Sequence, residues 1–166
     1  MESKIKKLIF DILEVVILAM IISFLLIKFV FISVEVEGTS MVPTLSDRDR
    51  GISFVITKNI SVNRFDIVVV DVGKLIVKRV IGMPNETIEY KDNTLYIDGV
   101  KYDEPYLKDV KTGDFKVKLN SNEYYCLGDN REVSKDSRVY GPFTIEDFKA
   151  THVLVITPFS NFGFKK

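Results

Sequence analysis

The first candidate for chemistry is Ser40, which lies in a turn directly after a segment of alternating apolar and polar residues. The segment VEGTSMVPTL covers residues 36–45, and Gly38 and Pro43 mark the turn. Glycine lets another backbone, such as a substrate strand, approach closely. A serine at a strand end also leaves its own N–H free to face a developing oxyanion. An ordinary turn has the same composition, so Ser40 needs a nearby base before it becomes a candidate nucleophile.

The candidate base is Lys78, in the segment KLIVKRVIGMP at residues 74–84. In a strand, Lys78 shares a face with Ile76 and Val80, and burial among such apolar groups lowers the pKa of an amine. A neutral lysine can accept a serine proton. The alternative is a sheet lysine whose head group stays in water. The only histidine, His152, lies among apolar residues of a predicted strand and is interpreted as structural.

A third polar segment, LGDNREVSKDSRVYGP at residues 127–142, follows a predicted strand. It is either a plain surface loop or the support of a site. Four charged residues are candidates for a buried ion network that rigidifies that site, namely Asp129, Arg131, Asp136 and Arg138. Ser134 and Ser137 are candidates for orienting the lysine amine by hydrogen bonds.

The elements that must position these residues are mainly strands. Short β-branched or alternating runs, separated by turn residues, are typical of half-buried strands. They cover 32–38, 51–56, 66–72, 75–81, 87–90, 94–97, 100–102, 123–129 and 151–157. Asp98-Gly99 predicts a tight hairpin. A short helical turn is expected at 144–150, and 103–120 is interpreted as a long connection. The predicted fold class is mainly β, an antiparallel barrel or sandwich behind one N-terminal helix.

Residues 12–34 predict a transmembrane anchor, because they are long and apolar enough to cross a bilayer and contain only Glu14 and Lys28 as charges. A buried core helix and a cleaved signal peptide are the alternatives. Three lysines precede the span, and no Lys or Arg occurs from 29 to 47. The positive-inside rule therefore predicts a cytoplasmic segment at 1–11 and an extracytoplasmic catalytic β domain at 35–166.

Composition narrows the function classes. The chain has 166 residues with 23 basic and 23 acidic side chains, so no basic surplus favours nucleic acid as a partner. One cysteine and one histidine exclude a Cys- or His-rich metal cluster. No metal or other cofactor is predicted.

Together, the three segments behind one anchor resemble the bacterial type I signal peptidases, and the match covers essentially the whole chain. The nucleophile motif of that family appears as SMVPTL from Ser40, and its base motif as KRVIGMPNE from Lys78. Its Arg-Gly-Asp-Ile-Val motif appears as RFDIVVV from Arg64, with Phe65 in place of glycine. Its last motif appears in full as GDNREVSKDSR. The chain has no large inserted domain, and in this respect it resembles the compact Gram-positive form of the family.

The resemblance implies a role for each matched residue. Ser40 is expected to be the nucleophile of a serine endopeptidase and Lys78 its general base. Ser134 is expected to orient the Lys78 amine. Four residues are expected to form supporting ion pairs, namely Asp129, Arg79, Asp136 and Arg138. The Ser40 N–H is expected to hold the oxyanion. Some family members add a serine hydroxyl where this chain has Gly38, so another group must replace that donor.

The resemblance also implies the substrate and the partners. A signal peptide is expected to bind as an extended strand with small residues at positions −1 and −3 before the cut. Two shallow apolar pockets are expected to receive them, lined by Val36, Met41, Leu45, Ile76 and Val77. The expected partners are preproteins carrying signal peptides, the lipid bilayer and the secretion translocon. An exposed apolar rim near the anchor, including Phe31 and Phe54, is expected to dip into the lipid.

Two other functions fit parts of the pattern. The self-cleaving Ser–Lys fold of stress-response repressors is cytosolic and has a DNA-binding part, which disagrees with the apolar span. A membrane-tethered assembly factor descended from a peptidase would be non-catalytic. Such a protein is expected to lack either the serine or the lysine, and this chain keeps both.

Overall fold

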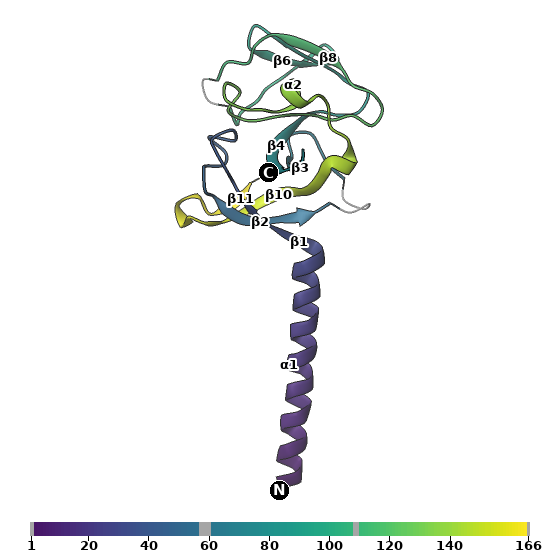
Figure 1. Cartoon of the computed structure of the whole chain (residues 1–166), viewed down its shortest axis with the longest axis vertical. Coiled ribbons are helices and arrows are strands. Elements are labelled where there is room, and N and C mark those ends of the chain that lie inside the picture. Colours follow the sequence, from purple (N-terminus) through teal and green to yellow (C-terminus); the bar gives the residue numbers. More distant parts are fainter. Residues whose placement is uncertain (1, 57–60, 108–109, 166) are drawn as a thin grey trace.

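The structure is a computed structural model that describes residues 2–56, 61–107 and 110–165. One long helix leads into a β domain of two antiparallel sheets, as Figure 1 shows. The elements in chain order are α1 Glu2–Val30, β1 Phe31–Glu35, β2 Arg50–Val55, β3 Ile67–Asp71, β4 Leu75–Gly82, β5 Thr87–Lys91, β6 Thr94–Ile97, β7 Val100–Tyr102, β8 Phe115–Lys118, β9 Tyr125–Leu127, α2 Ser137–Tyr140, η1 Ile145–Asp147, β10 Phe148–Thr157, η2 Phe159–Asn161 and β11 Gly163–Lys165.

Helix α1 projects from the domain as a single rod (Figure 1). Residues Lys4–Ile27 are long and apolar enough to cross a membrane, and they are the one such helix in the described part of the chain. None of that span is buried against the domain, so its apolar side chains face outward. The predicted span at 12–34 overlaps this helix, and its last four residues lie in β1.

The larger sheet carries the candidate site. In the described residues it has the order β1-β2-β10-β3-β4-β9, and β11 pairs with β10. Strand β3 is buried along most of its length, as its valine-rich sequence predicts, and β4 becomes fully buried from Lys78 onward. In the register of β3 and β4, Val68 lies opposite Lys78. The prediction of a mainly antiparallel β fold is confirmed.

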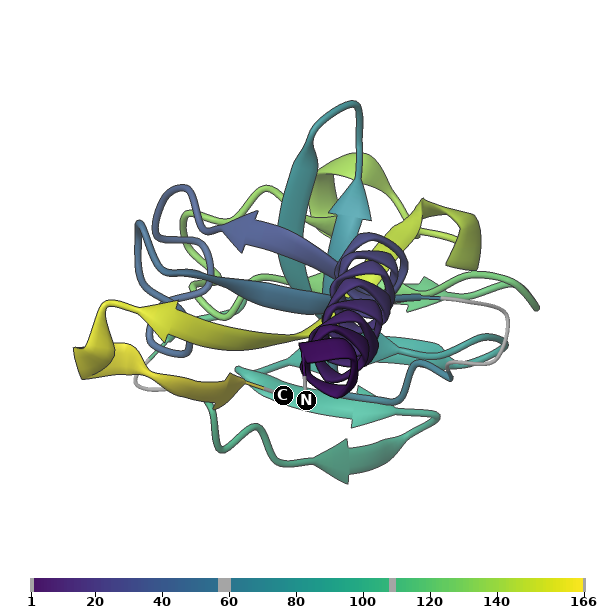
Figure 2. The same cartoon turned by 90° about the horizontal axis from the view of Figure 1, so that it is seen from below.

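The smaller sheet lies at the end of the domain away from α1, with the order β7-β6-β5-β8 (Figure 1). Figure 2 shows the domain from below, with α1 seen nearly end-on. Asp98 and Gly99 have φ angles of 50° and 81°, which suit the predicted tight hairpin between β6 and β7. A buried cluster that includes Tyr90, Leu95 and Leu127 packs this sheet against the larger one.

Two local predictions were incomplete. The segment 103–120, interpreted as a connection, contains β8, whose alternating Phe115–Lys118 pairs with β5 and leaves only Phe115 and Val117 half-buried. The expected helical turn at 144–150 is a single 3₁₀ turn, Ile145–Asp147, closed by a capping box from Thr144.

Candidate active site

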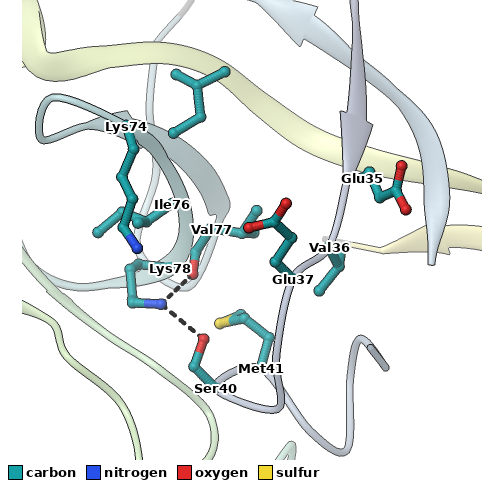
Figure 3. A pocket seen from close by; sticks show the side chains of 10 residues that line it. Glu35, Val36, Glu37, Ser40, Met41, Lys74, Ile76, Val77 and Lys78 are labelled. Atoms are coloured by element: carbon teal, nitrogen blue, oxygen red, sulfur yellow. Dashed lines mark hydrogen bonds between the residues drawn. The ribbon is translucent and has the colours of Figure 1, made fainter. Parts of the chain in front are cut away.

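The centre of the site is a contact between Ser40 and Lys78, which are 38 residues apart in the chain. The Lys78 Nζ donates to Ser40 Oγ at 2.9 Å and to the Val77 carbonyl at 2.6 Å (Figure 3). Ser40 lies in the turn after β1, and Lys78 extends from the middle of β4. The two candidates from the sequence are therefore within proton-transfer distance.

The Lys78 amine is buried, with 3% of the residue exposed. This burial lowers the pKa of Lys78 to about 8, although the carboxylates of Asp136 and Asp129 act in the opposite direction. The positive charge of Lys74 lowers it slightly further. A pKa of about 8 leaves roughly a tenth of the amines neutral at pH 7 and about half at pH 8.

A bidentate ion pair holds the turn that carries Ser40. Arg79 Nε and Nη2 donate to the two oxygens of Asp129 at 2.8 and 2.7 Å. The Thr44 hydroxyl donates to the same carboxylate and accepts from Arg79 at 3.2 Å. Because successive strand residues point to opposite faces, Lys78 reaches one end of this turn and Arg79 the other. Thr44 belongs to the motif SMVPTL, but no role for its side chain was predicted.

A second ion pair orders the polar loop after β9. Arg138 donates to both oxygens of Asp136 at 2.9 and 2.8 Å, and the Gly128 backbone N–H adds a bond of 3.0 Å. Burial raises the pKa of Asp136, but the hydrogen bonds from Arg138 and Gly128 outweigh it, so the pKa lies below its ordinary value. The loop also contacts the nucleophile turn, because the Asn130 N–H donates to the Ser40 carbonyl at 3.0 Å.

The Arg131 side chain does not join these two pairs, although the Arg131 carbonyl accepts from Arg138 Nη2 at 2.7 Å. It forms an ion pair with Glu104 and donates to Tyr90 and Thr112 at 2.5 and 2.9 Å, which ties the loop to the smaller sheet. Three of the four candidate residues therefore belong to ion pairs near the dyad, Asp129 with Arg79 and Asp136 with Arg138, whereas Arg131 pairs with Glu104.

Ser134 is a buried residue of this loop, and no hydrogen bond joins it to Lys78 in the described residues. A Cβ built on Gly128 would lie 2.2 Å from Ser134 Oγ and 2.5 Å from the Ser40 carbonyl. Only a glycine lets these two segments approach so closely. Ser137 instead accepts from the Cys126 N–H at 2.9 Å.

The backbone N–H groups of Gly38 and Ser40 differ in whether they are already hydrogen-bonded. Gly38 has a φ of 83°, and its N–H donates to Asp47 at 2.7 Å, so that N–H is already engaged. Within the described residues, no hydrogen bond to another group uses the Ser40 N–H. His152 lies elsewhere in the larger sheet and contacts Asp66, with 3.3 Å between Nε2 and Oδ1.

A hollow of about 320 Å³ opens beside the dyad, between the segment after β1 and the start of β4 (Figure 3). This first hollow is lined by four of the five predicted pocket residues, namely Val36, Met41, Ile76 and Val77. Leu45 is fully buried in the core cluster beneath them and does not line it. Glu35, Glu37 and Lys74 contribute charges at the rim.

Comparisons with known proteins show which family the chain is similar to. The family model described as "Signal peptidase, peptidase S26" matches residues 9–157. Signal peptidase I S of Bacillus subtilis (strain 168) is 38% identical, over 93% of this chain and 92% of the relative. Signal peptidase IB of Staphylococcus aureus (strain MRSA252) is 36% identical, over 88% of each chain.

A solved structure is similar as well. The crystal structure of a signal peptidase I from Enterococcus faecalis V583 is 34% identical, with a TM-score of 0.51, and the match covers 59% of this chain and 98% of that one. The extent of the family match and the identity over most of both chains decide the family. The chain belongs to the signal peptidases of family S26, membrane-anchored serine peptidases that cleave signal peptides.

Proposed function

We propose that this protein cleaves signal peptides with a Ser–Lys dyad in which Ser40 is the nucleophile and Lys78 the general base. The observation that carries the proposal is the 2.9 Å contact between Lys78 Nζ and Ser40 Oγ at a buried amine. A lysine that is partly neutral near pH 8 can take the proton of the hydroxyl as the oxygen attacks.

The reaction then proceeds in two stages. Ser40 Oγ attacks the scissile carbonyl, its proton moves to Lys78 Nζ, and the Ser40 N–H stabilises the oxyanion. Collapse of this intermediate breaks the C–N bond, and Lys78 gives its proton to the leaving amine, which leaves an ester on Ser40. Water, deprotonated by Lys78, hydrolyses that ester and restores the hydroxyl.

The supporting residues position the dyad. The Arg79–Asp129 pair holds the nucleophile turn through Thr44, and the Asp136–Arg138 pair holds the loop that packs on the Ser40 carbonyl. Ser134 is assigned to orienting the Lys78 amine.

The first hollow receives the small side chains before the cut, and its apolar residues Val36, Met41, Ile76 and Val77 limit their size. The substrates are preproteins carrying signal peptides. The placement proposed for the chain is residues 1–11 in the cytoplasm, 12–34 in the bilayer and 35–166 outside, close to the secretion translocon.

The test is cleavage of a preprotein by the full-length protein in detergent micelles. Ser40→Ala and Lys78→Ala are each expected to abolish cleavage while the near-ultraviolet circular dichroism stays unchanged. Ser121→Ala and Lys91→Ala, both at exposed positions, serve as matched controls and are expected to keep full activity. Full activity in either dyad variant would refute the mechanism, and an inactive wild type would favour the non-catalytic assembly factor.

A further inference from the structure

A second hollow, of about 260 Å³, adjoins the dyad and shares part of its lining with the first. Both hollows share Ser40, Lys78 and Ile76, together with the rim residues Glu37 and Lys74. Beyond them, the second hollow is bounded by Gly38 and Thr39 on one side and by Val133, Lys135 and Tyr140 on the other. One continuous groove therefore passes over the dyad.

The position of the anchor gives this groove a direction. Glu35 lines the first hollow and ends β1, which begins directly after α1. Five strand residues span roughly 17 Å, so the first hollow lies close to the membrane end of the domain. Tyr140 ends α2, which lies farther from α1 (Figure 1). A signal peptide whose apolar part stays in the bilayer must enter through the first hollow and leave through the second.

The second hollow has an excess of positive charge. Lys74 and Lys135 are exposed at its rim, and no ion pair engages either of them in the described part of the chain. Glu37 is the one acidic residue among those that line it. The partly protonated Lys78 adds positive charge at the base. Acidic side chains on a bound peptide therefore strengthen its binding to this surface, and basic side chains weaken it.

We propose that the second hollow binds the first residues of the mature protein, and that Lys135 and Lys74 make the enzyme prefer acidic over basic residues at the second and third positions after the cut. The inference rests on the proposed function, because it takes Ser40 as the point of cleavage. Lys135 and Lys74 are specificity residues, and neither takes part in the bond-breaking steps. Exposed ion pairs are individually weak, so two of them correspond to a preference of roughly three- to ten-fold.

The test uses two peptides that are identical except at the second and third positions after the cut, Glu-Glu in one and Lys-Lys in the other. The full-length protein in neutral detergent micelles is expected to cleave the acidic peptide with a kcat/KM about five-fold higher. Lys135→Glu is expected to remove or reverse that ratio, and Lys91→Glu, the same charge change in the smaller sheet, is expected to leave it unchanged. Salt near 1 M, which shortens the screening length to about 3 Å, is expected to reduce the wild-type ratio.

The outcomes separate the two proposals. A wild-type ratio near one, or the same ratio in Lys135→Glu as in the wild type, would overturn the inference while leaving the dyad intact. If Lys135→Glu and Lys91→Glu shift the ratio equally, the preference reflects the overall charge of the protein, and the inference about the second hollow is overturned. Failure to cleave either peptide would overturn the proposed function, and the inference with it.

Discussion

Replacing Lys78 by Met is expected to inactivate the protein and to stabilise it at neutral pH. Methionine has a similar length and no charge, so it removes the cost of holding an ammonium in a buried position. A site that lowers the pKa of Lys78 from 10.5 to about 8 opposes the charged form by about 3 kcal/mol. The wild-type protein bears this cost below pH 8, where the amine is protonated in both the folded and the unfolded state.

The same substitution also removes two hydrogen bonds, to Ser40 Oγ and to the Val77 carbonyl. Each contributes about 1 kcal/mol. The charge effect is larger, so the net stabilisation expected below pH 8 is about 1 kcal/mol, or a rise in Tm of roughly 3 °C.

The sign of the stability difference between Lys78→Met and the wild type changes with pH. The folded-state pKa lies below the unfolded one, so between about pH 8 and 10.5 the unfolded wild type binds more protons than the folded one. The wild type therefore gains stability relative to the variant across that window. Above pH 10.5 the variant is expected to be the less stable of the two, because only the lost hydrogen bonds remain.

The assay is urea unfolding of both full-length proteins in detergent micelles from pH 6 to 11, followed by near-ultraviolet circular dichroism. Lys91→Met is the matched control at an exposed lysine and is expected to show no pH-dependent difference. A constant difference between Lys78→Met and the wild type across the whole range would refute the reasoning, because it would mean that Lys78 titrates alike in both states.

Three further predictions follow from the site. The kcat/KM for a preprotein is expected to rise with pH with a midpoint near 8 and to fall about ten-fold per unit below it, as a pH profile would measure; a flat profile down to pH 6 would exclude Lys78 as the base. Asp129→Asn is expected to lower kcat at least ten-fold and to cost about 3 kcal/mol in unfolding free energy, because it leaves Arg79 buried without its counter-charge; wild-type stability would contradict this. Gly128→Ala is expected to lower kcat about a hundred-fold by displacing Ser134 and the nucleophile turn, whereas Gly113→Ala, where the added methyl meets open space, is expected to remain active; equal activities would contradict the close packing.

Much of the fold follows from local sequence signals. The apolar run predicted α1, and the β-branched runs predicted the strands of the larger sheet except β11, because these segments match the helix and strand periods. Strand β8 was missed because its alternation is only four residues long and lies within a polar segment. Helix α2 was missed because its single turn depends on Asp136, which caps it while pairing with Arg138.

The site was predictable in its residues and less so in its contacts. The resemblance identified Ser40 and Lys78. The distance between their side chains, however, depends on how the turn after β1 folds over β4, which no local pattern encodes. The hydrogen bonds of Thr44 and of the Val77 carbonyl likewise depend on tertiary structure and cannot be predicted from local sequence. Leu45 was expected in a pocket because it is apolar and near Ser40, yet it is held in the core by Met41 and Ile67.

The direct measurement is the titration of the Lys78 amine itself in the full-length protein. Proteins labelled with ¹³C at the lysine side chains can be followed by NMR in micelles, and Lys78→Met identifies the resonance that belongs to position 78. We predict a midpoint near pH 8 for this resonance. A midpoint near 10.5, the value of an amine in water, would contradict the claim that the fold prepares Lys78 to act as a base.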